Sequence, residues 1–163
     1  MKKVKKGNMK NTFIKVLVAG AIAGIVATGV KTVWEKGFPA RAESTDSPPL
    51  ILTDRAKQAA GEGSLTEQQK PPLETTIHWT FGITVCLIYS LLAEKYPQAR
   101  FGYGLLFGIA LYSVTHATVL PALETEPWFF ENKPEYALSE FGSHLAFGVM
   151  TEIIRRFISE KLD

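Results

Sequence analysis

Ionisable residues recur at a spacing of four within a long apolar stretch near the C-terminus. Residues 137–154 are mostly apolar, yet they include Glu140, His144 and Glu152. In an α-helix, steps of four follow one slowly drifting stripe, which here also contains Gly148. A charge that faces hydrocarbon is costly, so we expect this stripe to face protein or water. The spacing predicts either a membrane helix with a buried polar face or an amphipathic core helix.

The three histidines of the chain and one of these carboxylates are predicted to form a polar intramembrane cluster. At about 1.5 Å per residue, His78 and Glu140 lie roughly 5 Å below the outer ends of their predicted helices. His116 and His144 lie roughly 10 Å below theirs. The cluster suits proton or small polar solute handling, because histidine titrates near neutral pH and exchanges protons with a carboxylate. Imidazole and carboxylate also suit zinc, and in a third interpretation each histidine only joins neighbouring helices.

A second polar group is predicted at the cytoplasmic end of the same stretch. Glu152 precedes Arg155 by three residues and Arg156 by four, a spacing that favours local ion pairs on a helix. A cytoplasmic exit for protons is the alternative role of Glu152. The two arginines are typical of an orientation signal that contacts lipid phosphates.

The sequence contains no catalytic signature. It has no nucleophile elbow, P-loop or H-E-x-x-H motif, so we expect neither an enzyme nor a bound cofactor. Cys86 is the single cysteine, which excludes a disulfide or a thiolate metal cluster within one chain. The net charge of +2 gives no indication of a nucleic-acid partner.

Four apolar runs are expected to position these residues across a bilayer. They cover about residues 12–34, 75–93, 101–123 and 137–154, near the roughly 20 residues that a spanning helix needs. The first three lack the polar half that helices of a soluble bundle show. The expected fold is all-α, a polytopic membrane protein whose four-transmembrane-helix bundle forms one domain over residues 1–163. A cleaved signal peptide is the alternative for the first run.

The distribution of charge predicts the orientation. The segments 1–15, 94–100 and 155–163 hold eleven Lys and Arg residues, whereas the loops 35–74 and 124–136 hold six together with eleven acids. Basic loops stay in the cytoplasm, so both termini are expected there and the two loops outside. Lys31 is expected to reach the outer membrane surface with its long side chain. A short helix is expected within the first loop, over residues 50–61.

Small residues recur four apart in two of the runs. Gly20 and Gly24 form one pair, and Gly104 and Gly108 form another. Such pairs permit close helix approach, either within the bundle or between two copies. The expected partners are therefore the lipid bilayer and a second copy of the chain in a homo-oligomer.

The ending of the chain resembles that of the YagU family of bacterial inner-membrane proteins. The similarity rests on residues 139–156, S-E-F-G-S-H-L-A-F-G-V-M-T-E-I-I-R-R, and covers most of the chain from Ala19 onward. Matching positions outside this ending are Lys31, Trp34, His78, Ala93, Glu94, Pro97, Gly104, Gly108, His116 and Pro121. The resemblance implies a bacterial plasma-membrane protein of undefined activity, loosely tied to acid tolerance. The alternative is a non-transporting membrane scaffold or stress-response accessory with structural histidines.

Overall fold

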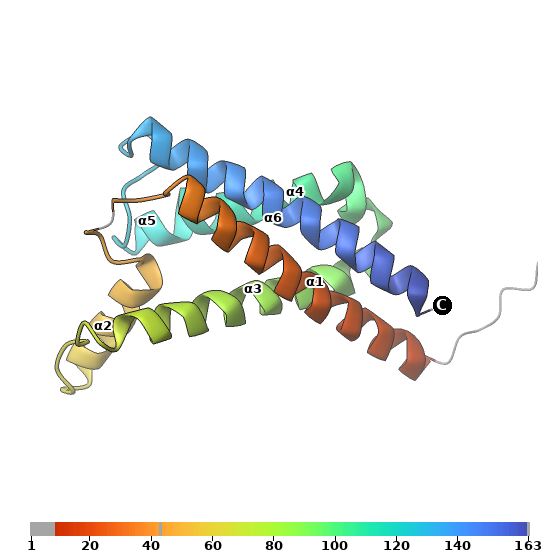
Figure 1. Cartoon of the computed structure of the whole chain (residues 1–163), viewed down its shortest axis with the longest axis horizontal. Helices are drawn as coiled ribbons and strands as arrows, with labels where there is room; N and C mark the ends of the chain where they lie inside the picture. Colours follow the sequence, from red (N-terminus) through yellow and green to blue (C-terminus); the bar gives the residue numbers. More distant parts are fainter. Residues whose placement is uncertain (1–8, 43, 163) are drawn as a thin grey trace, which may run out of the picture.

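The computed structural model describes residues 9–42 and 44–162, and this part of the chain is helical without a β-strand (Figure 1). Three long helices extend along the molecule: α1 (Met9–Gly37), α3 (Lys70–Lys95) and α6 (Pro134–Lys161). The shorter ones are α2 (Pro48–Ala59), η1 (Pro97–Gly104), α4 (Leu105–Val114), η2 (Thr115–Val119) and α5 (Leu120–Ala122). The predicted all-α class is confirmed for these residues. Several residues used to predict the orientation lie outside them: Lys2, Lys3, Lys5, Lys6, Glu43 and Asp163.

Successive apolar segments run in opposite directions: α1 and the segment from α4 to α5 run toward one end of the molecule, and α3 and α6 run back (Figure 1). We call one end the terminal end; it contains the start of α1, the end of α6, and η1. We call the other end the loop end; it contains α2 and the loops 38–47 and 123–133. This arrangement follows from a hairpin connection between successive apolar helices.

Helix α1 is the centre of the bundle and packs against both α3 and α6. Ala19, Ala23 and Ala27 are completely buried along it. Small side chains let the backbones approach closely, so that a Cβ atom added at Gly24 would lie 2.7 Å from the Cα atom of Ile83 in α3. The Gly20 and Gly24 pair is therefore used within the chain.

The second glycine pair joins α4 to α6. A Cβ atom added at Gly108 would lie 2.3 Å from the carbonyl oxygen of His144, and one added at Gly148 would lie 2.4 Å from that of Gly104. The two backbones are thus in direct contact along the stripe predicted for α6. Since both glycine pairs contact helices of the same chain, homo-oligomerisation stays a prediction.

The predicted third run, 101–123, is not one continuous α-helix. Gly102, Tyr103 and Gly104 have positive φ angles of 65°, 52° and 87°, so the regular helix begins only at Leu105. Two of these three residues are glycines, which adopt the left-handed region without steric cost. The turn between α3 and α4 therefore continues past residue 101, where the hydrophobicity of the sequence predicted the next helix to begin.

The first polar loop also differs from its predicted limits. Helix α3 begins at Lys70 instead of Thr75, because Pro71 and Pro72 lie in its first turn, where the missing N–H groups cost nothing. The short helix predicted over 50–61 is confirmed as α2.

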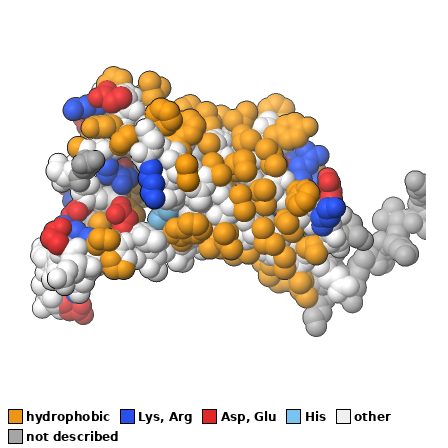
Figure 2. Space-filling model, in the orientation of Figure 1, with side chains coloured by type: hydrophobic (Ala, Val, Ile, Leu, Met, Phe, Trp, Pro, Cys, Tyr) orange, Lys and Arg blue, Asp and Glu red, His pale blue; other side chains and the backbone are white. Residues whose placement is uncertain are grey.

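Three helical segments are long and apolar enough to cross a membrane: Asn11–Gly37, Lys70–Lys95 and Pro97–Ala122. Figure 2 shows a band of hydrophobic side chains around the middle of the molecule, with charged residues gathered at both ends. Helix α6 is not among the three segments, since the polar residues on its buried face lower its mean hydropathy. Its outward face is nevertheless apolar and includes Leu138 and Phe157, both exposed. Four membrane spans were predicted, and three of them are long and apolar enough in the structure.

Candidate functional site

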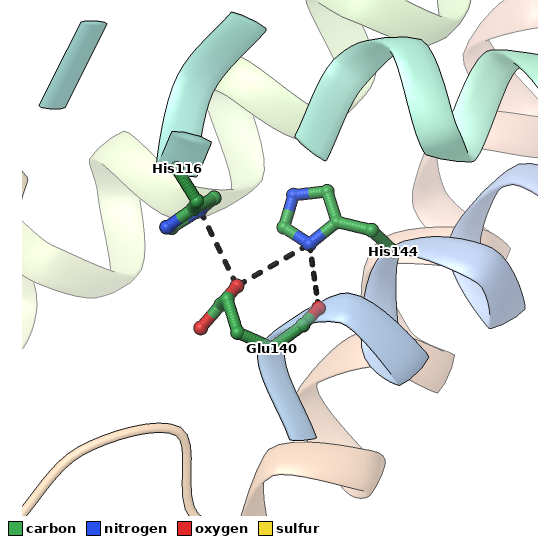
Figure 3. A group of neighbouring side chains, drawn as sticks. All are labelled: His116, Glu140 and His144. Atoms are coloured by element: carbon green, nitrogen blue, oxygen red, sulfur yellow. Dashed lines mark hydrogen bonds and ion pairs between the residues drawn. The ribbon is translucent and has the colours of Figure 1, made fainter. Parts of the chain in front are cut away.

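Helix α6 holds Glu140 and His144 one turn apart on its buried face (Figure 3). Glu140 is 6% exposed and His144 is 2% exposed. Both lie on the α6 stripe, which packs against α1 and α4 through small residues. Because α1 and α4 cover this stripe, the two side chains are shielded from the apolar outer surface.

His116 reaches the same place from a widened turn of the third segment. Pro121 lacks the N–H group that an α-helix would direct at the carbonyl of Ala117. The preceding residues form the π-helical turn η2 instead, a distortion frequently found at functional sites. The imidazole rings of His116 and His144 have their centroids 4.8 Å apart, with Tyr112 beside both rings. The turn therefore brings His116 against α6.

The carboxylate of Glu140 is the common partner of Lys31 and of two histidines, and Figure 3 shows its contacts with His116 and His144. Its Oε1 atom accepts a hydrogen bond of 2.8 Å from the Lys31 ammonium. The Nε2 atom of His116 and the Nδ1 atom of His144 each lie 3.3 Å from the same oxygen. Lys31 also forms a hydrogen bond with Glu35, one turn further along α1. We call this group the Glu140 site: Lys31, Glu35, His116, Glu126, Glu140 and His144.

The contacts of the two imidazoles assign their protons. The Nδ1 atom of His144 lies 2.9 Å from the backbone carbonyl of Glu140, which accepts only, so we assign the N–H group to this nitrogen. The Nδ1 atom of His116 lies 3.0 Å from both carboxylate oxygens of Glu126 and donates to them by the same reasoning. In the neutral imidazole, which has a single N–H, the Nε2 atom of His116 then directs a lone pair at Glu140, whereas in the imidazolium it donates to Glu140. Two acceptors that face each other need a proton or a cation between them.

The Glu140 site has an excess of negative charge. Within its hydrogen bonds and ion pairs, three carboxylates (Glu35, Glu126 and Glu140) meet one ammonium, Lys31. With both histidines neutral, two negative charges are left without a partner in this network. The side chains of Glu126 and Glu140 are 18% and 8% exposed, and charges in such surroundings are stable only when they are paired. The geometry therefore favours the uptake of positive charge.

A pocket of about 240 Å³ connects this site with the loop end. It is lined by Tyr112, His116 and Glu140 and by loop residues within 40–42, 45–48 and 125–137. Glu126 is one of these loop residues, and it bonds to His116. His144 is not among the residues that line the pocket. Access from the loop end therefore reaches His116 and Glu140 first.

The structure brings together three of the four residues predicted for the intramembrane cluster. His78, on α3, is not part of this three-residue group: its Nε2 atom lies 3.4 Å from the hydroxyl of Thr32, and it interacts with Glu35, Lys31 and Glu140 through charge only. The predicted second group lies at the terminal end, where Arg155 forms hydrogen bonds of 2.7 and 2.9 Å with Glu152. The Nε atom of Arg156 lies 4.0 Å from the same carboxylate.

Sequence reasoning missed Lys31, Glu35 and Glu126 as members of the site. Lys31 was expected to reach the membrane surface, but it is only 9% exposed and turns inward to Glu140. Its two carboxylate partners, the buried Glu140 and the half-buried Glu35, hold the ammonium inside the bundle. The spacing of four between Lys31 and Glu35 was the available signal. Nothing in the sequence pattern indicates that Glu126, in a loop, meets His116.

Three side chains of the site have ligand atoms that a metal ion could share. His116, Glu140 and His144 each offer one such atom, and these atoms lie within 4.8 Å of one another. Nitrogen and oxygen donors of this kind suit zinc better than calcium or magnesium, which prefer oxygen alone.

Comparison with known sequences identifies one family. The family described as "Protein of unknown function (DUF1440)" matches residues 25–153, which include the second half of α1 and α6 as far as Ile153. No curated protein and no solved structure matches the chain.

Proposed function

We propose a function from the geometry of the Glu140 site, because the chain belongs to the DUF1440 family of proteins of unknown function. The protein takes up protons or a small polar solute that carries positive charge at this site. The proton or solute enters from the loop end. The observation that carries the proposal is the buried carboxylate of Glu140, which meets Lys31 and His116 in a network with two unpaired negative charges. A pocket that opens at the loop end supplies the route.

We place the protein in the bacterial plasma membrane as a multi-pass protein with four spans, of which α6 is the fourth. The inward direction of Glu140, His144 and Glu152, together with the apolar outward face of α6, supports this placement. The basic segments at the terminal end support a cytoplasmic location for both termini. The resemblance to the YagU family supports a role in acid stress. No catalytic constellation supports an enzyme.

A scaffold or accessory protein without transport is the competing function. Its support is the number of contacts that Lys31 and Glu140 make between α1 and α6, since a buried ion pair also fixes helix register. In that case, the Glu140 site would hold the bundle together and take up nothing.

Acid survival and internal pH in cells that lack the native protein would separate these functions. Cells that express the Glu140→Gln variant are expected to lose survival and internal pH control relative to wild type, because the variant removes one of the three negative charges of the Glu140 site. The control is Glu135→Gln, which changes the same residue type at an exposed position of α6. If Glu140→Gln is inserted normally and behaves as wild type, the uptake of charge is excluded as the function.

A further inference from the structure

We propose that the Glu140 site binds one divalent transition-metal ion of the zinc class. The ligands are the Nε2 atom of His116, a carboxylate oxygen of Glu140 and a ring nitrogen of His144, whose ligand atoms lie within 4.8 Å of one another. This inference rests on the proposed function for its route of access, and it names the ligand of the same site. Three protein ligands leave a fourth position open toward the pocket, as in zinc sites that exchange a bound group.

The first step of the argument is the environment of His116. Histidines that bind a metal through one nitrogen usually donate the other N–H to a carboxylate or a carbonyl. Glu126 accepts this bond from Nδ1 of His116 at 3.0 Å, which leaves Nε2 as the ligand. The ring of His144 is fixed in a comparable way by the backbone carbonyl of Glu140, at 2.9 Å.

The second step is the distance between His116 and Glu140. Their Nε2 and Oε1 atoms lie 3.3 Å apart although both are acceptors in the assigned state. Around a tetrahedral zinc ion with bonds of about 2.0–2.2 Å, neighbouring ligand atoms are separated by roughly 3.3–3.5 Å. The observed pair is therefore already spaced as two ligands of one ion.

The third step is the charge. Glu35, Glu126 and Glu140 carry three negative charges against the single positive charge of Lys31. One divalent ion neutralises the remainder, whereas a monovalent ion leaves part of it. The two imidazoles select against magnesium and calcium, which are bound by oxygen ligands.

Lys31 can remain in place when the ion binds. Its ammonium contacts both Glu35 and Oε1 of Glu140, and a carboxylate provides about four lone-pair positions on its two oxygens. Glu140 can therefore bind the ion and keep its bond to Lys31.

Equilibrium binding of Zn²⁺ to the purified full-length protein in detergent tests the proposal. Wild-type protein stripped with a chelator is expected to bind one Zn²⁺ per chain by calorimetry, and Co²⁺ should give the visible absorption bands of a tetrahedral nitrogen and oxygen site. Glu126→Gln should weaken Zn²⁺ binding by about 10–100-fold, because the Glu126 carboxylate orients the His116 ring through its Nδ1 atom. His116→Ala and His144→Ala should weaken it more.

The matched control is His78→Ala, which removes a histidine of α3 that contacts Thr32 outside the ligand group. This variant should bind Zn²⁺ as wild type does, and equal losses in His78→Ala and His144→Ala would overturn the site. Because the wild-type titration needs no variant to fold, a wild-type protein that binds neither Zn²⁺ nor Co²⁺ also overturns it. That result would leave the uptake of charge intact, since the acid-survival experiment is independent of metal binding.

Discussion

The Glu152 carboxylate is a second buried acid, and its partners differ from those of Glu140. It is completely buried and receives two hydrogen bonds from Arg155 and one of 2.9 Å from the hydroxyl of Tyr89 in α3. These neighbours balance the charge of Glu152 and donate hydrogen bonds to it, so this group has no excess of negative charge. Arg156, exposed, contributes at 4.0 Å and lies over the Tyr103 ring. We therefore assign Glu152 a structural role and the Glu140 site the functional one.

This difference predicts unequal effects of the two neighbouring arginines on stability. Arg155→Gln should lower the free energy of unfolding by about 3 kcal/mol, because it leaves the buried Glu152 charge without its main partner. Arg156→Gln, at an exposed position, should cost less than about 1 kcal/mol. Denaturant unfolding in detergent, followed by tryptophan fluorescence, provides the comparison. Equal losses in both variants would show that burial does not distinguish the two pairs.

At the scale of elements, the contact between α4 and α6 positions the site. The π-helical turn η2 directs His116 toward α6, while the glycines before it let α4 lie directly on the α6 backbone. The carbonyl of His144 itself contacts Gly108, so the packing of α4 and the position of the His144 ring are linked through one residue. A substitution that changes the contact between α4 and α6 should therefore alter the Glu140 site more than the rest of the bundle.

Replacing Gly108 tests this link. In Gly108→Ala the new Cβ atom would lie 2.3 Å from the His144 carbonyl oxygen, so α4 must move away from α6. Overpacking of this kind costs about 1–3 kcal/mol and should lower the midpoint of thermal unfolding measured by circular dichroism in detergent. In the control, Gly37→Ala, the added Cβ atom meets nothing within 4 Å. The packing argument fails if Gly108→Ala melts at the temperature of wild type, or if the control loses as much.

At the scale of the whole molecule, the two ends have different chemistry. The pocket, the Glu140 site and both polar loops belong to the loop end, whereas the Glu152 pair and the described basic residues Arg100, Arg156 and Lys161 belong to the terminal end. An apolar band separates them (Figure 2). If this band lies in the bilayer, the pocket of the Glu140 site opens toward one side of the membrane.

Cysteine labelling in intact cells would establish the topology. In a Cys86→Ala background, a cysteine at Asn132 in the loop before α6 should react with a membrane-impermeant maleimide. A cysteine at Ser159, near the end of α6, should react only after the cells are opened. The reason is that α6 is proposed to cross the bilayer with its basic end in the cytoplasm. Labelling of both positions from the outside would mean that α6 does not span.

The sequence by itself determined the helical class, the apolar segments and the stripe of α6, because these depend on local periodicity and on the cost of exposing charge to hydrocarbon. It also indicated His116, Glu140 and His144 as residues that could meet. Only the tertiary structure decided that His78 is not one of the grouped ligands and that Lys31 and Glu126 belong to the site. It also decided that both glycine pairs pack within the chain. These outcomes depend on which helix faces which, on a left-handed turn and on a π-helical turn, and no local pattern specifies such long-range geometry.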